Sequence, residues 1–238
     1  MTKAIIFDKD GTLMDFDAFW VAVSKRAILD VLKNFNAEEG LVDEILFSIG
    51  VSADGVTDMD GVLCKGTYEE IGRVVYGVLK KHGVNICAES ITKSVVKAYN
   101  ENSDKGEVRA TDPELKGTLI RLKNQGVKLA VATTDNEYIT RLCLEKLGIK
   151  DLFDRVYCDD GVNPNKPNPY YALKFLSEEN IDKSCAVMVG DTVTDVKFSQ
   201  NAGIKVIGVA KNLKNKERLS AYTNTVVDKI SDILGVLD

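Results

Sequence analysis

This sequence of 238 residues has few of the residues that several common types of active site require. It contains one histidine, and its five cysteines are odd in number and scattered, with no CxxC pair. Scattered cysteines are typical of reduced thiols in a protein core rather than of a disulfide framework or a zinc site. The histidine, His82, precedes Gly83 at the end of an expected helix, where a cation interacts favourably with the helix dipole. Ser-His-Asp hydrolases and zinc hydrolases therefore lack essential parts here.

An excess of positive charge and long apolar runs are also absent. Acidic residues number 36 against 31 basic ones, which gives a formal charge of -5. This balance argues against a general polyanion binder, so we expect no nucleic-acid partner, although local cations can still capture a small anionic substrate. No apolar run approaches the roughly 20 residues that span a membrane, and the start, MTKAIIFDKD, lacks a signal-peptide pattern. We therefore expect a cytoplasmic protein with no membrane partner.

The stretch 3–12, KAIIFDKDGT, is the one around which the rest of the chain is organised. Its apolar run has the length and bulk of a strand buried on both faces, as in the middle of a parallel sheet. The run ends in Asp8 and Asp10, followed by Gly11, whose backbone can take turn conformations that a side chain resists. The carboxyl end of such a strand is where open α/β sheets place their sites.

Two carboxylates this close repel each other by roughly 4 kcal/mol at ~4 Å and an effective dielectric of about 20, unless they share a cation. The expected partner of Asp8 and Asp10 is a hard divalent metal. The alternative is that both are ordinary loop acids, because Asp followed by Gly is a common turn signal.

The pattern of apolar residues changes twice along the chain. At 45% hydrophobic residues, the chain can bury a sizeable core in one large domain or two smaller ones. Residues 16–103 show helical periodicity and little strand signal, interrupted by a Gly-rich and Asp-rich loop at 50–66. We expect a small helical domain there, with the return linker in the polar segment 100–106. The expected domains are therefore 16–103 and a core made of 1–15 and 104–238.

From Asp112 onward, helical and strand patterns alternate. Apolar strand-like runs occur at 127–133, 155–158, 185–190 and 205–210, with helical patterns between them. Helices and strands that take turns predict a parallel sheet wrapped on both faces. The predicted fold class is thus α/β, a doubly wound parallel sheet with an inserted small helical domain.

Thr133 and Thr134 stand at the end of the run VKLAVATT. A hydroxyl and adjacent backbone N–H groups between a strand and a helix form a natural cradle for a phosphate oxygen. The alternative is a simple helix cap, because Thr133, Thr134 and Asp135 are all residues that cap helices well.

Lys166 lies in the segment NPNKPNP, surrounded by three of the four prolines. The prolines stiffen the loop, so that little entropy remains to be lost when the lysine engages an anion. A solvated surface lysine is the alternative, but the position after a strand and before a helix favours the sheet edge that holds Asp8.

The segment VGDTVTD places Asp191 after an apolar strand and Asp195 in the first turn of a helix. Acids at a helix start interact well with its dipole, which is the alternative interpretation. Asp191 and Asp195 are nevertheless expected to point back toward Asp8 and Asp10. Four carboxylates that converge on one edge of the sheet need a cation. Ligands made only of oxygen suit Mg²⁺.

Four motifs in this order, DKDGT, a hydroxyl at the next core strand, KP in a loop and GDxxxD, resemble those of the haloacid dehalogenase (HAD) superfamily. The resemblance covers the whole chain, since the helical insert is similar to the cap domain of the phosphoglycolate phosphatase and β-phosphoglucomutase branch. It implies a HAD-like Rossmannoid core and the activity of a phosphoric monoester hydrolase.

The resemblance also implies roles. Asp8 is then the nucleophile that forms an aspartyl phosphate, and Asp10 the general acid and then base. Thr133 and the Thr134 backbone hold the phosphoryl group, and Lys166 neutralises the charge of Asp8 and phosphate. Thr134 departs from the Asn often found at this position of the family.

The family's metal site carries over in the same way. Asp8, the Asp10 carbonyl and Asp191 are the implied Mg²⁺ ligands. Asp195 is expected to reach the ion through a water or from behind the direct ligands.

The expected function is a Mg²⁺-dependent phosphatase acting on a small phosphorylated metabolite, phosphoglycolate-like or a sugar phosphate, as a monomer or homodimer. A β-phosphoglucomutase-like phosphotransferase shares every core residue, but resembling mutases carry a basic residue where Ala53 follows Ser52. A non-catalytic phosphometabolite-binding module is the third possibility, and no expected catalytic position is missing that would favour it. The loop 50–66, with Lys65, is the candidate for specificity, although a solvated surface charge is the simpler interpretation of that lysine.

Overall fold

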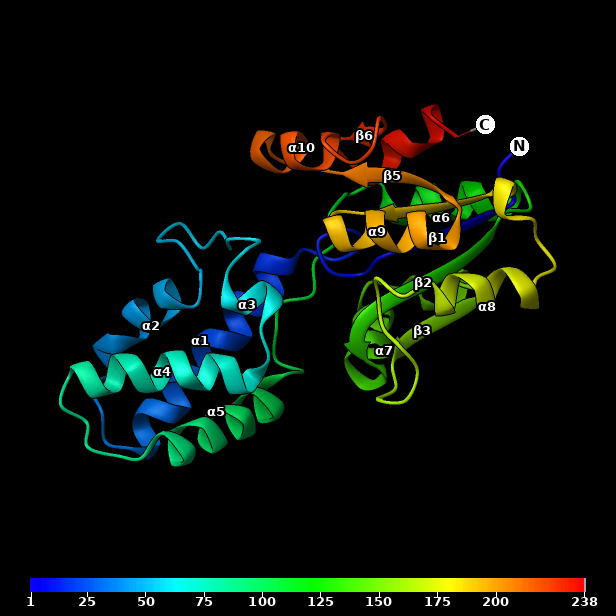
Figure 1. Cartoon of the computed structure of the whole chain (residues 1–238). Coiled ribbons are helices and arrows are strands. Elements are labelled where there is room, and N and C mark those ends of the chain that lie inside the picture. Colours follow the sequence, from blue (N-terminus) through cyan, green and yellow to red (C-terminus); the bar gives the residue numbers. More distant parts are fainter. Residues whose placement is uncertain (238) are drawn as a thin grey trace. The chain divides into compact units, whose positions relative to one another are not determined.

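The computed structural model describes residues 1–237 as two compact units, an α/β unit and a helical unit (Figure 1). The α/β unit consists of Met1–Asp15 and of the chain from Val108 onward, and the helical unit spans Phe16–Glu107. Residues 104–107, which we expected in the α/β core, are part of the helical unit. Their backbone packs there: a Cβ built on Gly106 would lie 2.4 Å from Cδ2 of Phe19.

A six-stranded sheet with all strands parallel forms the α/β unit, so the predicted fold class is confirmed. The order of the strands is β3-β2-β1-β4-β5-β6. Their bounds are Ala4–Phe7 for β1, Lys128–Asn136 for β2, Arg155–Asp159 for β3, Ala186–Gly190 for β4, Lys205–Val209 for β5 and Val226–Val227 for β6.

Helices cover both faces of this sheet (Figure 1). Successive residues of β1 point to opposite faces, as strand geometry requires. Ile5 packs in one apolar cluster with Leu119 of α6, whereas Ile6 packs in the other with Phe175 of α8 and Phe198 of α9. The helices of the unit are α6 Leu115–Asn124, α7 Glu137–Lys146, α8 Tyr170–Glu178, α9 Val193–Ala202 and α10 Leu213–Ser220.

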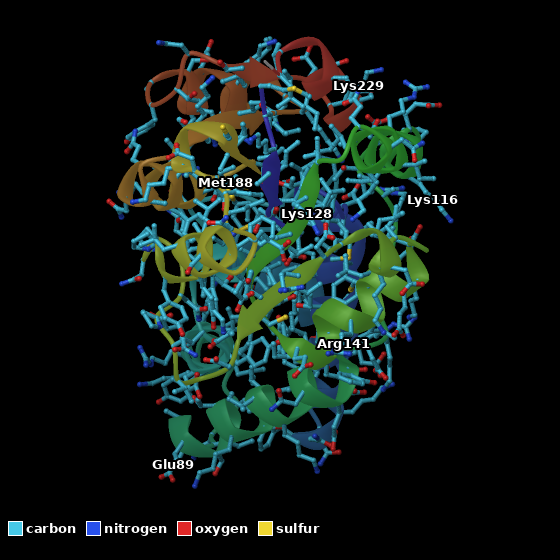
Figure 2. All side chains as sticks on the ribbon, turned by 90° about the vertical axis from the view of Figure 1, so that its right-hand side faces the viewer. Glu89, Lys116, Lys128, Arg141, Met188 and Lys229 are labelled. Atoms are coloured by element: carbon cyan, nitrogen blue, oxygen red, sulfur yellow. The ribbon has the colours of Figure 1, made fainter. Side chains whose placement is uncertain are left out.

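Side chains on the sheet and on the helices follow this layering. The β4 residue Met188 is fully buried between the layers, whereas the charged groups of Lys116 and Arg141 lie on the outside of α6 and α7 (Figure 2). A parallel sheet sealed on both faces leaves only the ends of its strands open to ligands.

The chain reverses its winding direction at β1, and this places the site. It runs from β1 outward to β2 and β3, then returns to β4 on the other side of β1. Phe7 at the end of β1 pairs with Val131 of β2 and Val189 of β4, so the residues that follow these strands meet at one edge. Ligands bind at such a topological switch point in open α/β sheets.

The helical unit contains α1 Phe16–Asn34, α2 Val42–Ser48, α3 Val62–Lys65, α4 Tyr68–Lys81 and α5 Ala88–Asn102. The expected loop 50–66 thus ends in the short helix α3. Asp17 of α1 fastens this loop by accepting hydrogen bonds from the backbone N–H (3.1 Å) and the hydroxyl (2.6 Å) of Thr57. Lys65 is engaged locally in an exposed ion pair with Asp60.

No helix within residues 1–237 combines the length and the apolar character that a membrane span requires.

Two glycines of α4 provide a matched test of the helical packing. A Cβ at Gly72 would lie 2.8 Å from the Cα of Thr92 in α5, whereas nothing lies within 4 Å of a Cβ at Gly77. Gly72→Ala forces two backbones apart and is expected to lower the free energy of unfolding by about 1–3 kcal/mol. Gly77→Ala is expected to raise it by roughly 0.5–1 kcal/mol, because alanine is the better helix former. Urea unfolding of both variants checks this, and changes of the same sign would contradict the packing of α4 on α5.

Candidate active site

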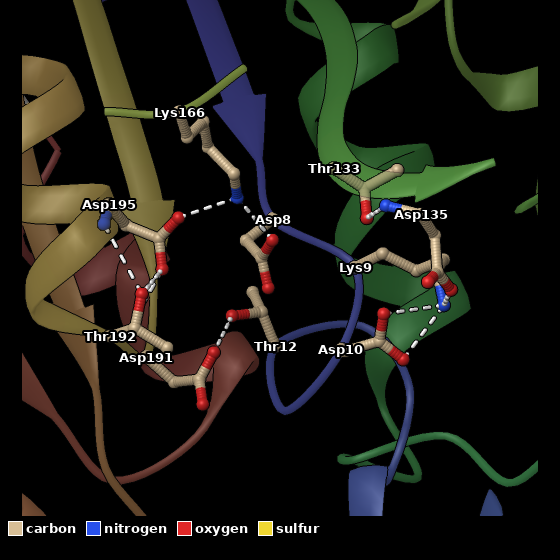
Figure 3. A network of polar contacts seen from close by, with 10 residues as sticks. All are labelled: Asp8, Lys9, Asp10, Thr12, Thr133, Asp135, Lys166, Asp191, Thr192 and Asp195. Atoms are coloured by element: carbon tan, nitrogen blue, oxygen red, sulfur yellow. Dashed lines mark hydrogen bonds and ion pairs between the residues drawn. The ribbon is translucent and has the colours of Figure 1, made fainter. Parts of the chain in front are cut away.

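Asp8, Lys166 and Asp195 meet at the carboxyl end of β1 (Figure 3). The Asp8 backbone N–H donates to the carbonyl of Val189, which continues the β1–β4 ladder by one residue. The Lys166 ammonium donates to Oδ1 of Asp8 and, at 2.7 Å, to Oδ1 of Asp195. The three side chains are nearly inaccessible, at 9%, 5% and 1% exposed for Asp8, Lys166 and Asp195. The structure thus brings together residues that lie 158 positions apart in the chain.

Besides its contact with Lys166, Asp195 caps the start of α9. Its Oδ2 accepts from the backbone N–H (3.0 Å) and the hydroxyl (2.6 Å) of Thr192, which completes a capping box. The helix-start interpretation of this acid and its approach to Asp8 are therefore both correct. Gly190 is required for this arrangement, because a Cβ there would lie 2.5 Å from the Cβ of Asp195.

The loop that follows β1 contacts Asp191 through Thr12 and Gly11. The Thr12 hydroxyl donates to Oδ1 of Asp191 at 2.9 Å, and Asn215 donates to its backbone carbonyl at 3.1 Å. Gly11 has a φ of 81°, and a Cβ there would lie 2.2 Å from Oδ2 of Asp191. A glycine is thus needed both for the turn and for the close approach of this carboxylate.

Carboxylate oxygens of Asp8, Asp191 and Asp195 lie within 4.8 Å of one another, and all three residues are buried. Burial raises the pKa of Asp8 to about 7, although the Lys166 ammonium acts in the opposite direction. Burial, followed by the charges of Asp8 and Asp195, raises the pKa of Asp191 well above its ordinary value. One ammonium does not balance three carboxylates, and a hard divalent cation bound here would supply the missing positive charge. The donor set, made only of oxygen, fits Mg²⁺.

The Asp10 carboxylate lies outside this cluster and faces Lys9 (Figure 3). The Lys9 side chain is fully buried, with its ammonium 2.7 Å from Asp10 and 2.8 Å from Asp135 at the end of β2. Burial lowers the pKa of Lys9, but the two carboxylates outweigh it and raise the pKa above its usual value. Burial raises the pKa of Asp135 to about 6, against the influence of Lys9. Asp10 as a backbone ligand of the metal stays a prediction.

Thr133 and Thr134 differ in their surroundings. Strand β2 continues to Asn136, three residues beyond the expected end, and the Asn136 side chain caps α7 by accepting from the Ile139 N–H at 3.0 Å. The helix-cap interpretation of Thr133, Thr134 and Asp135 is therefore wrong. Thr133 is buried and its hydroxyl accepts from the Asp135 N–H at 3.2 Å, whereas Thr134 is exposed.

Sequence reasoning missed three residues with clear roles in this geometry, namely Lys9, Thr12 and Asp135. Lys9 and Thr12 were inside the first motif but had no assigned task. The available signal was the position of Lys9 itself, because a charged residue two positions after a fully buried strand has little access to water and needs partners. Asp135 carried no separate signal beyond its place at a strand end.

The family comparison agrees with this architecture. The model of the haloacid dehalogenase-like hydrolase family matches residues 5–209. In sequence, the chain is similar to Pyrophosphatase PpaX of Bacillus velezensis, with 31% identity over 235 residues that make up 98% of this chain and 95% of that protein.

Solved structures share the fold over the full length. A predicted phosphoglycolate phosphatase from Haemophilus somnus 129pt has a TM-score of 0.71 at 22% identity and covers 99% of this chain and 97% of its own. Magnesium-bound YfnB from Bacillus subtilis has a TM-score of 0.68 at 16% identity, with 100% and 99% covered. Since the family model and the sequence relative both span most of the chain, the resemblance is confirmed: the chain is an enzyme of the haloacid dehalogenase-like hydrolase family.

Proposed function

We propose that the chain is a Mg²⁺-dependent phosphatase that hydrolyses a small phosphorylated substrate through an aspartyl phosphate on Asp8. The observation that carries this proposal is the buried contact of Lys166 with Asp8, beside Asp191 and Asp195 at the end of β1. A nucleophilic carboxylate whose charge is masked by a cation is what attack on an anionic phosphoryl group requires.

The first step forms a bond between an Asp8 oxygen and phosphorus as the bond from phosphorus to the leaving oxygen breaks. Lys166 reduces the repulsion between the Asp8 carboxylate and the phosphoryl oxygens. Asp195 holds the Lys166 ammonium at 2.7 Å and is itself fixed by the capping box, so the lysine is already oriented before substrate binds.

Asp10 donates a proton to the leaving oxygen in this step. In the second step, Asp10 takes a proton from the attacking water, the Asp8–phosphorus bond breaks, and inorganic phosphate and the free Asp8 carboxylate result. The same side chain serves as acid and as base because the first step leaves it deprotonated.

Asp8 and Asp191 would hold the Mg²⁺ through their carboxylates, with the Asp10 carbonyl as a further ligand and Asp195 behind them. The ion supplies positive charge that stabilises the phosphoryl oxygens. A magnesium-bound structure of the same fold, that of YfnB, supports this choice of ion. Thr133 and the Thr134 backbone N–H, at the end of β2 next to β1, are the proposed donors to the phosphoryl oxygens.

Pyrophosphate joins phosphoglycolate and sugar phosphates as a candidate substrate, because the similar PpaX proteins are named pyrophosphatases. Steady-state kcat/KM for these three classes, measured with the same preparation, ranks them. The mutase alternative gains no support: the Ser52 hydroxyl is engaged by Asp54 and by the Val56 carbonyl, and the following Ala53 offers no cation. The cytoplasmic location and the monomeric or homodimeric state stay predictions.

Asp8→Asn is expected to lower kcat by roughly 10⁴-fold or more, because the amide is a poor nucleophile. The fold is expected to remain intact, since the amide is isosteric with the carboxylate. Phosphate release with saturating substrate and Mg²⁺ measures the effect, and circular dichroism verifies the fold. Exposed Asp151, changed to Asn, is the matched control and is expected to keep wild-type kcat. Retained turnover in Asp8→Asn would remove Asp8 from the nucleophile role.

Asp191→Asn is expected to abolish stabilisation by Mg²⁺ without weakening the metal-free fold. The amide removes a buried charge that repels its neighbours and still accepts the hydrogen bond of Thr12. In the wild type, Mg²⁺ at 100 times its Kd should raise the free energy of unfolding by about 2.7 kcal/mol. Thermal unfolding with and without Mg²⁺, at constant ionic strength, compares the two proteins. An equal Mg²⁺ effect in both would exclude Asp191 as a ligand.

A further inference from the structure

Lys9 has no part in the chemistry described above, yet its side chain is completely buried. Its ammonium contacts the carboxylates of Asp10 and Asp135, which lie on the side of the loop away from Asp191 (Figure 3). Replacing such a buried ionic group by an apolar residue of similar size is often neutral or stabilising in proteins. Stability alone therefore does not account for a lysine at this position.

The contact with Lys9 restricts the orientation of the Asp10 carboxylate as well as its distance from the ammonium. The ammonium lies 2.7 Å from Oδ1 and 2.7 Å from Oδ2 of Asp10, so it engages both carboxylate oxygens at once. A two-point contact restricts rotation of the carboxylate about its Cβ–Cγ bond. The second partner, Oδ2 of Asp135 at 2.8 Å, gives the ammonium a further contact on the neighbouring strand β2.

Backbone hydrogen bonds fix both Lys9 and Asp135 close to the sheet. The Lys9 carbonyl accepts from the backbone N–H groups of Leu13 and Met14, each at 2.9 Å, which closes the loop after β1. Asp135 lies near the end of β2, the neighbour of β1, and its N–H is bonded to the Thr133 hydroxyl. Lys9 thus links the catalytic loop to the adjacent strand.

We propose that Lys9 and Asp135 are positioning residues for Asp10: Asp135 holds the Lys9 ammonium, and Lys9 orients the Asp10 carboxyl group, whose proton passes to the leaving oxygen. This inference rests on the proposed function, in which Asp10 is the general acid. Proton transfer needs a heavy-atom distance of about 2.6–3.2 Å. A displacement of about 1 Å reduces the rate on the order of 100-fold.

The test compares substrates that need a proton with one that does not. p-Nitrophenyl phosphate releases a stable anion, whereas phosphoglycolate and glycerol phosphate release strongly basic alkoxide oxygens; of these two, the one that the wild type hydrolyses faster is used. Asp135→Asn removes the anchor but leaves Lys9 paired with Asp10, so the buried ammonium remains neutralised. Its kcat/KM, which reports the first step only, is expected to fall about tenfold or more on the basic-leaving-group substrate and less than about threefold on p-nitrophenyl phosphate.

Asp10→Asn gives the reference, because it should show the same dependence on the leaving group more strongly. Asp159→Asn, at the end of the neighbouring strand β3, is the matched control and is expected to affect neither substrate. Asp135→Ala serves as a second variant with the same expectation, and circular dichroism confirms that each is folded.

An equal loss on both substrates, or no loss on either, would overturn the positioning role while leaving the phosphatase function intact. A wild type without Mg²⁺-dependent turnover of any of the three substrates would instead overturn the proposed function, and the inference with it.

Discussion

The buried ion pairs of Lys166 with Asp8 and Asp195 are the interaction on which the rest of the site depends. They join the end of β1, the loop before α8 and the first turn of α9, three segments distant in sequence. Burying these charges separately is costly, and the pairs are favourable only if the backbone delivers all partners at once. The parallel sheet does this, since β1 and β4 end at the same edge and the chain reverses direction between them.

The two lysines of the site divide its negative charge into two groups on either side of the loop after β1. Lys166 is shared by Asp8 and Asp195, and Lys9 is shared by Asp10 and Asp135. The Asp191 side chain accepts a hydrogen bond from Thr12, and its backbone carbonyl accepts one from Asn215. The unbalanced negative charge therefore lies beside Asp8, where the proposed Mg²⁺ and phosphoryl group would bind, and the proposed acid lies on the other side of the loop.

The sequence was sufficient for the fold class, and for the meeting of Lys166 and Asp191 with Asp8, because strand ends in a parallel sheet share an edge. The sequence did not reveal in which direction the side chains at these strand ends point. Asp8 and Asp10 were expected to face one cation, but the turn at Gly11 and the burial of Lys9 direct the Asp10 carboxylate elsewhere. The end of β2 was also misplaced by three residues, because Thr133, Thr134 and Asp135 have cap propensity and only the tertiary structure selects Asn136.

In the proposed mechanism, a phosphoryl group passes to Asp8. Rapid acid quenching during steady-state turnover, followed by peptide mapping with mass spectrometry, tests it most directly. We expect a phosphorylated peptide that contains Asp8, which disappears when hydroxylamine is added and is absent in Asp8→Asn. Rapid turnover with a phosphoryl group on another residue, or with no phosphorylated peptide and inversion of configuration at phosphorus, would contradict it.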